Sequence, residues 1–304
     1  MSDFVVLLLG VVILYGSAEA LVKSSVKIAN LMKMRTFIIG ATIVSLTSSI
    51  PELSISLTSL SKHHSEIMLG NIIGSNIANI LLVIGVASLI RPWEVKQSIL
   101  PKDKSFLYIA TVIFSFFAYN AKISRIEGMI LFACFIAYNF FLINKSKAKQ
   151  IQTLSNIEAA QFYIKNFFHN YKMIFFIGVG VIGSIGGSFL IVNRAVNIAN
   201  ILGIKKIVIS ISLVSIATAL PELGMAIVSS IRKQTELILG NVIGSNIYNL
   251  FFVTGLSVSF FPVTLAEDKI HFQLGTLILI SFLIYPFSQK SFHFSRSKAV
   301  LTPI

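Results

Sequence analysis

The chain has 304 residues, of which 55% are apolar and only 12% are charged. Ordinary soluble domains carry roughly twice that share of charged residues. The composition therefore excludes an ordinary soluble domain and indicates an integral membrane protein. The net charge of +13 does not indicate a nucleic-acid partner, because the basic residues stand at the ends of apolar runs and in the loops between them.

Apolar runs long enough to cross a bilayer, about 20 residues each, recur from end to end of the chain. The first run is not followed by a small-residue cleavage site and takes part in an internal repeat, so we expect a mature helix rather than a signal peptide. We predict an all-α integral membrane protein with nine spans, near residues 4–22, 37–60, 67–90, 105–120, 126–143, 173–192, 207–231, 237–261 and 270–287.

The distribution of Lys and Arg predicts the orientation of these spans. With the N-terminus outside, the inner loops and tail hold 18 Lys and Arg residues, and the outer side holds 7. Cytoplasmic loops of membrane proteins carry such an excess. We therefore expect a multi-pass protein of the cell (inner) membrane, with a cytoplasmic basic linker at 144–172 that joins a first half at 1–143 to a second half at 173–304.

The two halves share a repeat at an offset of 170 residues. Ser-Ser-Ile-Pro-Glu at 48–52 corresponds to Thr-Ala-Leu-Pro-Glu at 218–222, and Gly-Asn-x-Ile-Gly-Ser-Asn-Ile at 70–77 returns at 240–247. Equivalent points are five spans apart, and this odd number predicts two inverted five-helix repeats, an arrangement typical of secondary transporters. A duplication kept only for packing is the alternative, but packing alone does not explain a shared Pro-Glu pair.

Glu52 and Glu222 are carboxylates inside the apolar runs of this repeat. A carboxylate at membrane depth is costly and marks a functional site by default. Pro51 and Pro221 precede them, and we expect each proline to kink or break its helix and to free carbonyl oxygens there. Two carboxylates from two related halves predict one ion site built from both.

Hydroxyl side chains occur four and seven residues before each glutamate, and these positions share one helix face with it. The alternative is that each hydroxyl bonds back to its own helix, as Ser and Thr commonly do. Their matched positions beside two carboxylates favour a ligand role for Ser48, Ser45, Thr218 and Ser215.

The second motif supplies neutral oxygen donors next to small residues. Close helix approach is expected at Gly70, Gly74, Gly240 and Gly244. The polar candidates beside them are Asn71, Ser75, Asn79, Asn241, Ser245 and Asn249. The asparagines could instead bond one helix to another. Oxygen ligands of this kind suit Ca²⁺, and no Cys and His cluster indicates zinc or copper. Glu19 and Lys23 have the spacing of a structural helical ion pair.

At these residues the chain resembles the cation/calcium exchanger superfamily, and within it the sodium/calcium exchanger branch of prokaryotic type. The resemblance covers residues 10–287, with its two motifs at 40–80 and 210–250. It implies ten helices in two inverted halves, with two long tilted helices that slide past the core during alternating access. It implies no enzyme activity and no cofactor apart from the transported Ca²⁺ and Na⁺.

Carried over by motif position, the resemblance gives each residue an expected role. It implies that Glu52 and Glu222 bind both calcium and sodium, with side-chain or backbone oxygens from Ser48 and Thr218. It implies backbone carbonyls from Ser45 and Ser215, sodium sites lined by Ser75 and Ser245, and a centre completed by Asn79 and Asn249.

The chain also departs from the family pattern. Thr-Ser-Ser at 47–49 and Ala-Thr-Ala at 217–219 stand where Gly-Thr-Ser is usual. Asn249 stands where potassium-dependent relatives carry aspartate, and the Gly-Asn-x-x-Glu pattern of proton-coupled relatives is absent. A tenth helix is expected to be missing after the ninth span, although Ser-Arg at 295–296 resembles the entry to the fifth helix.

We therefore expect sodium-driven calcium antiport. The alternatives are calcium/proton antiport, with the glutamates as proton carriers, and a truncated homologue that does not transport.

Overall fold

The computed structural model describes residues 2–31, 34–94, 100–148, 171–201, 206–264, 270–284 and 293–294. Most of the predicted linker at 144–172, and the segment in which a tenth helix was expected to be missing, lie outside these residues. The described part of the chain is helical apart from four strands of two residues each, which agrees with the predicted all-α class.

The first half begins with one long helix and continues through several shorter segments. They are α1 (Ser2–Leu31), α2 (Thr36–Ile39), the π-helix η1 (Gly40–Val44), α3 (Ser45–Ser48), α4 (Ile50–Ser61), α5 (Ser65–Ala78), the π-helix η2 (Asn79–Val83), α6 (Ile84–Ile90), β1 (Trp93–Glu94), α7 (Leu100–Ala118), β2 (Lys122–Ile123) and α8 (Arg125–Ala148).

The second half follows a similar order. Its elements are α10 (Tyr171–Ile201), α11 (Lys206–Ile231), α12 (Thr235–Ile247), the π-helix η3 (Tyr248–Val253), α13 (Thr254–Phe260), β3 (Val263–Thr264), α14 (Ile270–Phe282) and β4 (His293–Phe294).

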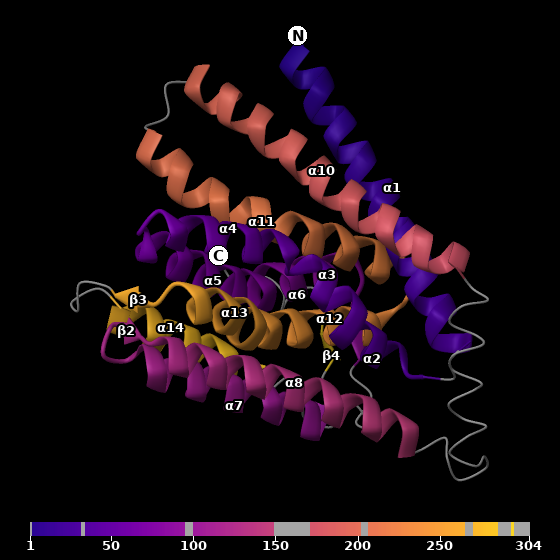
Figure 1. The fold of residues 1–304 in the computed structure, drawn as a ribbon. Coiled ribbons are helices and arrows are strands. Elements are labelled where there is room, and N and C mark those ends of the chain that lie inside the picture. Colours follow the sequence, from indigo (N-terminus) through magenta and orange to yellow (C-terminus); the bar gives the residue numbers. More distant parts are fainter. Residues whose placement is uncertain are drawn as a thin grey trace.

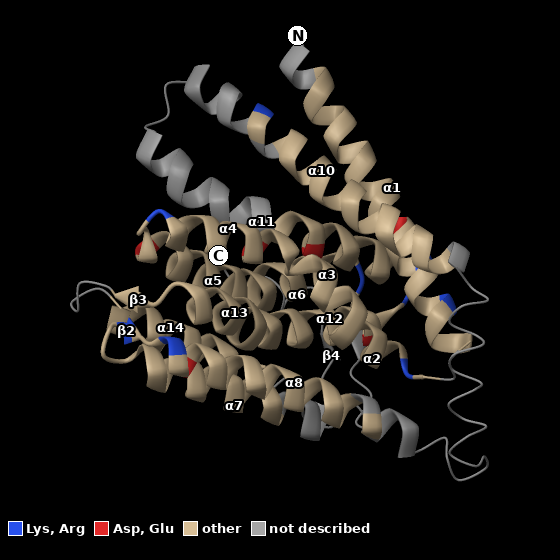
Figure 2. Ribbon diagram, in the orientation of Figure 1, with Lys and Arg blue, Asp and Glu red and all other residues tan. Residues whose placement is uncertain are grey.

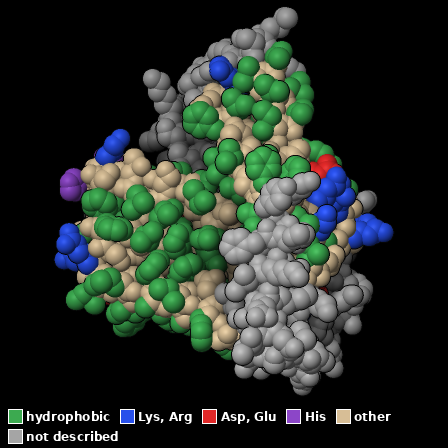
Figure 3. All heavy atoms as spheres, turned by 45° about the vertical axis from the view of Figure 1, so that its right-hand side comes forward, with side chains coloured by type: hydrophobic (Ala, Val, Ile, Leu, Met, Phe, Trp, Pro, Cys, Tyr) green, Lys and Arg blue, Asp and Glu red, His purple; other side chains and the backbone are tan. Residues whose placement is uncertain are grey.

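Apolar helices occur at all nine predicted positions in the described chain. Six are long and apolar enough to cross a membrane: Val5–Leu31, Thr36–Ser61, Ser65–Ile90, Arg125–Leu142, Met173–Ile191 and Thr235–Phe260. The shorter ones are Ser105–Ala118, Ala219–Ile231 and Ile270–Phe282. Hydrophobic side chains cover much of the face in Figure 3, as expected for a protein surrounded by lipid. The chain is a multi-pass integral membrane protein, and nine crossings stay a prediction.

The helices α1 and α10 run across one side of the bundle as a pair (Figure 1). Glycines allow their backbones to approach closely. A Cβ added at Gly187 would lie 2.8 Å from the backbone nitrogen of Leu14, and one at Gly180 would lie 2.9 Å from the carbonyl of Ser17. Both helices extend beyond the predicted spans, which ended near residues 22 and 192. The extension of α1 carries Lys23, whose charge is paired with Glu19.

Two apolar clusters form the core. One joins α5, α7, α8, α12 and α14, and includes the fully buried Phe114, Leu131 and Leu277. The other joins α1 and α10 to the start of the second span, through residues such as Val22 and Ile39. The motif helices α4, α11 and α12 contribute residues to these clusters, and their repeated polar residues are buried inside the bundle.

Two short antiparallel ribbons connect the halves to each other. In one, β1 pairs with β4, with Trp93 opposite Phe294. In the other, β2 pairs with β3, with Ile123 opposite Val263. The strands β1 and β3 are 170 residues apart in the sequence, which is the offset of the repeat. The separation of β2 and β4 equals this offset to within one residue. Each half therefore contributes one strand to each ribbon, from equivalent places in the repeat.

A candidate ion-binding site

The backbone breaks beside Glu52. Helix α3 ends at Ser48, and Ser49 leaves the helical conformation with φ −84° and ψ 2°. Helix α4 then begins at Ile50, with Pro51 and Glu52 in its first turn. Proline suits this position, because its missing N–H would be unsatisfied there in any case. The predicted break in the first motif is therefore confirmed.

In the second motif the helix does not break, and of the two predicted outcomes only a kink is compatible with the structure. Helix α11 runs from Lys206 to Ile231 with Pro221 inside it. A proline within a helix removes one backbone hydrogen bond and crowds the preceding turn, but neighbouring groups in a membrane bundle allow the helix to continue. The two copies of the motif therefore differ in backbone structure although their sequences match.

Three π-helical turns, none of them predicted from the sequence, lie beside the candidate ligands. The turn η1 ends just before Ser45, η2 begins at Asn79, and η3 contains Asn249. At two of these turns a side-chain hydroxyl donates to the backbone carbonyl five residues before it. Ser45 Oγ donates to the carbonyl of Gly40 at 2.7 Å, and Thr254 Oγ1 donates to the carbonyl of Asn249 at 2.9 Å. Such turns are frequent at functional sites in helices.

The two carboxylates lie inside the protein, near each other. The exposed fraction is 1% for Glu52 and 2% for Glu222. They are close enough to interact electrostatically. Within the described residues, neither oxygen of Glu52 has a hydrogen-bond partner, Oε2 of Glu222 has none, and neither group forms an ion pair. A buried carboxylate needs a cation or a proton to be stable, so this pair of groups is a natural cation site.

Neutral oxygens from both halves are buried and similarly unsatisfied. Among the described residues, no hydrogen bond is formed by the side-chain oxygens of Asn71, Asn79 and Asn249. Each of these residues is at most 3% exposed. Unpaired buried carboxamide oxygens are uncommon and need an explanation, and a bound cation would supply it.

The serines of the two motifs meet across the halves. The hydroxyls of Ser48 and Ser245 lie 3.2 Å apart, and Ser245 also donates to the side-chain oxygen of Asn241 at 3.2 Å. Ser45 donates to the backbone carbonyl of Asn241 at 3.2 Å. Ser48 also donates to the carbonyl of Ser45 at 3.3 Å, and Ser75 donates to the carbonyl of Asn71 on its own helix.

Other predicted residues fall outside what the structure describes or do not behave as expected. The side chains of Ser215 and Thr218 are outside the described part, although both residues lie on α11. Close approach is confirmed at Gly240 and Gly244, where an added Cβ would collide with Phe37 and Ala41. The prediction was wrong for Gly70, where an added Cβ meets no described atom within 4 Å.

A small pocket reaches Glu222 from the layer formed by α1 and α10. Its polar lining includes the candidate ligands Ser48 and Glu222, together with Asn241. The remaining lining residues are Leu21, Val44, Thr47, Val181, Ser184, Ile185, Pro221 and Met225. The position of Leu21 on α1 and Val181 on α10 means that displacement of this helix pair would change access to the carboxylate.

Asn71 and Asn79 were predicted from the sequence, but the asparagine that binds to Asn79 was not. Asn246 accepts a 3.1 Å hydrogen bond from the side-chain nitrogen of Asn79. The repeated Gly-Ser-Asn run contained the signal, since Asn246 is its last polar residue.

The candidate ligand atoms of this site are carboxylate, carboxamide and hydroxyl oxygens, a set that suits hard cations such as Ca²⁺ and Na⁺. The described residues contain no group of three or more His, Cys, Asp or Glu placed to hold a metal ion.

A sequence profile of the family described as "Sodium/calcium exchanger protein" matches residues 2–144 and 172–302. Sodium/calcium exchanger MaX1 of Methanosarcina acetivorans is 31% identical, over 98% of this chain and 95% of that protein. Putative antiporter CaxA of Alkalimonas amylolytica is 30% identical, over 84% of this chain and 80% of that protein. A solved structure of the sodium-calcium exchanger NCX_Mj, soaked with 10 mM Na⁺ and zero Ca²⁺, has a TM-score of 0.81 and 30% identity, covering 99% of this chain and 95% of that one.

Proposed function

The chain belongs to the sodium/calcium exchanger protein family, and we propose that it exchanges Na⁺ for Ca²⁺ across the membrane by alternating access. The observation that carries this proposal is the pair of buried carboxylates, Glu52 and Glu222, without cationic partners among the described residues. Two ionised carboxylates balance one Ca²⁺. The same two charges accommodate Na⁺ in its place, so one site can serve both ions in turn.

The ligand set of the proposal comes from both motifs. Glu52 and Glu222 bind both ions, and Asn79 and Asn249 complete the centre with carboxamide oxygens. Ser48 and Ser245, whose hydroxyls lie 3.2 Å apart, bring hydroxyl oxygens of the two halves together. Oxygens of the remaining candidates complete the set: Ser45, Ser75, Ser215 and Thr218.

We further propose that the two halves are inverted repeats about this site. The paired ribbons support this, because β1 and β3 occupy equivalent positions and each pairs with a strand of the other half. The π-helical turns at Asn79 and Asn249 support it as well, since these asparagines are also 170 residues apart. Inverted repeats place a substrate near the membrane midplane, where two equivalent openings can alternate.

The proposed orientation places the N-terminus outside a cell (inner) membrane and the linker at 144–172 in the cytoplasm. This topology requires three segments to share the inner side, and ion pairs between described residues agree with that requirement. Arg232 pairs with Glu19, and Arg35 lies 3.8 Å from Glu236, so the C-terminal half of α1, the residue before α2 and the turn before α12 lie on one side. Most described Lys and Arg lie toward the ends of helices (Figure 2).

Uptake of radioactive calcium into proteoliposomes tests the proposal. Vesicles are loaded with Na⁺ and diluted into Na⁺-free medium that contains labelled Ca²⁺, with the same buffered pH on both sides. Uptake that requires the Na⁺ gradient supports sodium/calcium exchange. Uptake that instead follows an imposed pH gradient, without Na⁺, identifies a calcium/proton antiporter, the alternative that unpaired buried carboxylates also permit. Calcium binding without uptake under either gradient would indicate a protein that does not transport.

A further inference from the structure

A groove at one end of the bundle, separate from the ion site, is rich in positive charge. It has a volume of roughly 310 Å³. Three cations line it: Lys23 and Lys27 from α1, and Arg232 from the turn that follows α11. The remaining lining residues are Val22, Val26, Asn30 and Gln234.

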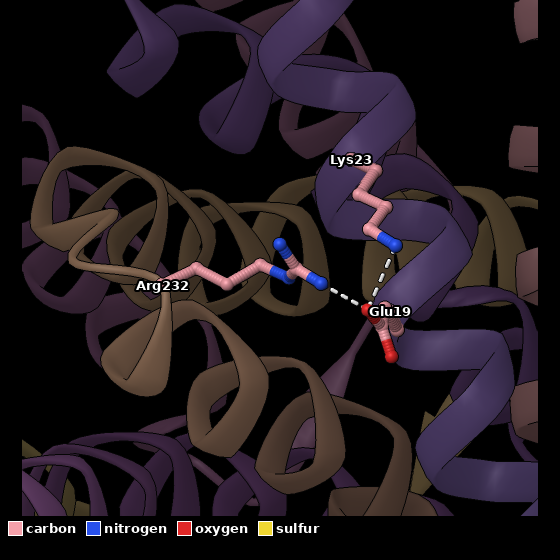
Figure 4. Close-up of polar contacts among 3 residues, drawn as sticks. All are labelled: Glu19, Lys23 and Arg232. Carbon is pink, nitrogen blue, oxygen red and sulfur yellow. Dashed lines mark hydrogen bonds and ion pairs between the residues drawn. The ribbon is translucent and has the colours of Figure 1, made fainter.

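Glu19 holds two of these cations in place. The Lys23 ammonium lies 2.8 Å from Glu19 Oε1, and the Arg232 guanidinium donates to the same oxygen (Figure 4). Lys23 and Arg232 stay 58% and 38% exposed, so their remaining donors face outward. With Lys27 the groove has three positive charges and one negative charge, a net +2.

The groove lies where the lipid-facing surface of α1 gives way to charged residues. The preceding turns of α1 expose large apolar side chains, with Leu9 53% and Val12 63% exposed. Within the groove the accessible apolar lining residue is Val26, which is partly exposed, while Val22 beside it is buried in the core. Figure 3 shows the basic and acidic side chains of this region beside an apolar surface. An occupant would therefore meet cations and carboxamides, with Val26 and the lipid-facing surface of α1 as nearby apolar contacts.

We propose that this groove binds the headgroup of an anionic phospholipid, with the phosphate held by Lys23, Lys27 and Arg232 and the first acyl carbons against Val26. Basic pockets between membrane helices on the cytoplasmic side recognise such headgroups. The partly exposed Val26 and the exposed apolar surface of α1 favour a lipid over free phosphate, which has no hydrocarbon to place there. A bound headgroup would connect α1 to the turn between α11 and α12. The inference is independent of which ions the chain exchanges.

Native mass spectrometry of the purified full-length chain tests this with phosphatidylglycerol and phosphatidylcholine as probes. We expect the parent protein to retain phosphatidylglycerol in preference to phosphatidylcholine. Lys27→Glu should weaken phosphatidylglycerol retention by about fivefold or more, since each surface cation near an anionic headgroup contributes at about that level. Lys27 is exposed and outside the Glu19 ion pairs, so this variant should fold normally.

Lys62→Glu is the matched control, because it makes the same charge change at an exposed position in the turn between α4 and α5. It should retain phosphatidylglycerol like the parent. Arg232→Gln provides a second variant in the groove, with an expected loss of retention. Equal effects of Lys27→Glu and Lys62→Glu would overturn the proposal and indicate general surface attraction. So would a parent that binds inorganic phosphate but does not prefer phosphatidylglycerol.

Discussion

Asn79 donates a 3.1 Å hydrogen bond from its side-chain nitrogen to the side-chain oxygen of Asn246, from one half of the protein to the other. Because the nitrogen of Asn79 is used in this way, its oxygen is the atom left without a partner in the described structure. Asn76 is the residue equivalent to Asn246, but it donates to the carbonyl of Ile72 on its own helix at 2.7 Å. Equivalent asparagines therefore form different hydrogen bonds in the two halves.

We therefore predict that Asn246→Ala weakens apparent calcium affinity by about fivefold, the effect of losing one hydrogen bond that orients a ligand. The maximal exchange rate should change much less, because no proposed ligand is removed. Calcium dependence of uptake in proteoliposomes measures both values. Asn76→Ala is the control, since its loss frees no proposed ligand. Equal loss of affinity in the two variants would contradict an orienting role for Asn246.

Glu52→Gln and Glu222→Gln should each reduce calcium exchange to background. Each change removes one negative charge from the site and keeps nearly the same shape. Both variants should melt at the parent temperature or above, because an unpaired buried carboxylate is costly to the fold. Uptake assays and thermal unfolding in detergent measure these outcomes, with the exposed Glu66→Gln as control. Near-normal exchange in either site variant would disprove a shared site.

Asn249→Asp should make exchange more dependent on an additional monovalent cation. Asn249 is 1% exposed and its side-chain oxygen is unpaired in the described structure, so a third carboxylate here would enter the same site. The site would then hold three negative charges, one more than Ca²⁺ balances. Calcium flux with and without potassium checks this prediction. Identical potassium responses of the variant and the parent would remove Asn249 from the site.

Gly240→Ala should destabilise the protein by about 1–3 kcal/mol, the usual cost of inserting a methyl group into a packed core. An added Cβ would collide with the carbonyl of Phe37, which is backbone and cannot turn away. Gly70→Ala, at the equivalent place in the other half, should be tolerated, because no described atom lies within 4 Å of its Cβ. Thermal unfolding of both variants provides the comparison, and similar losses would contradict the packing difference.

Cysteine labelling from the two sides of the membrane should locate the ends of the bundle. With Cys134→Ser as background, Lys27→Cys should react with an impermeant reagent only from inside, and Lys62→Cys only from outside. Both positions are exposed, so absence of labelling cannot be caused by burial in the bundle. The reverse pattern would invert the proposed orientation.

The sequence predicted the features that depend on repeated chemistry. Glu52 and Glu222 stood out because a carboxylate in an apolar run is conspicuous, and the structure buries both together. The π-helical turns at Asn79 and Asn249 could not be predicted, because they depend on how packing shifts one backbone hydrogen bond. The sequence also left open whether the helix at Pro221 breaks or continues, since it shows the strain of a proline but not the neighbouring groups that stabilise a continuous helix.

The ribbons have a consequence for the order in which the protein is made. Strand β1 leaves the ribosome before α7 through α14 exist, and its partner at His293–Phe294 is synthesised long afterwards. Strand β2 is likewise synthesised before its partner, Val263–Thr264. The first half therefore enters the membrane with two unpaired strand edges, which its own helices cannot satisfy. Completion of the second half closes both edges, so the late step of folding is the joining of two partly finished halves.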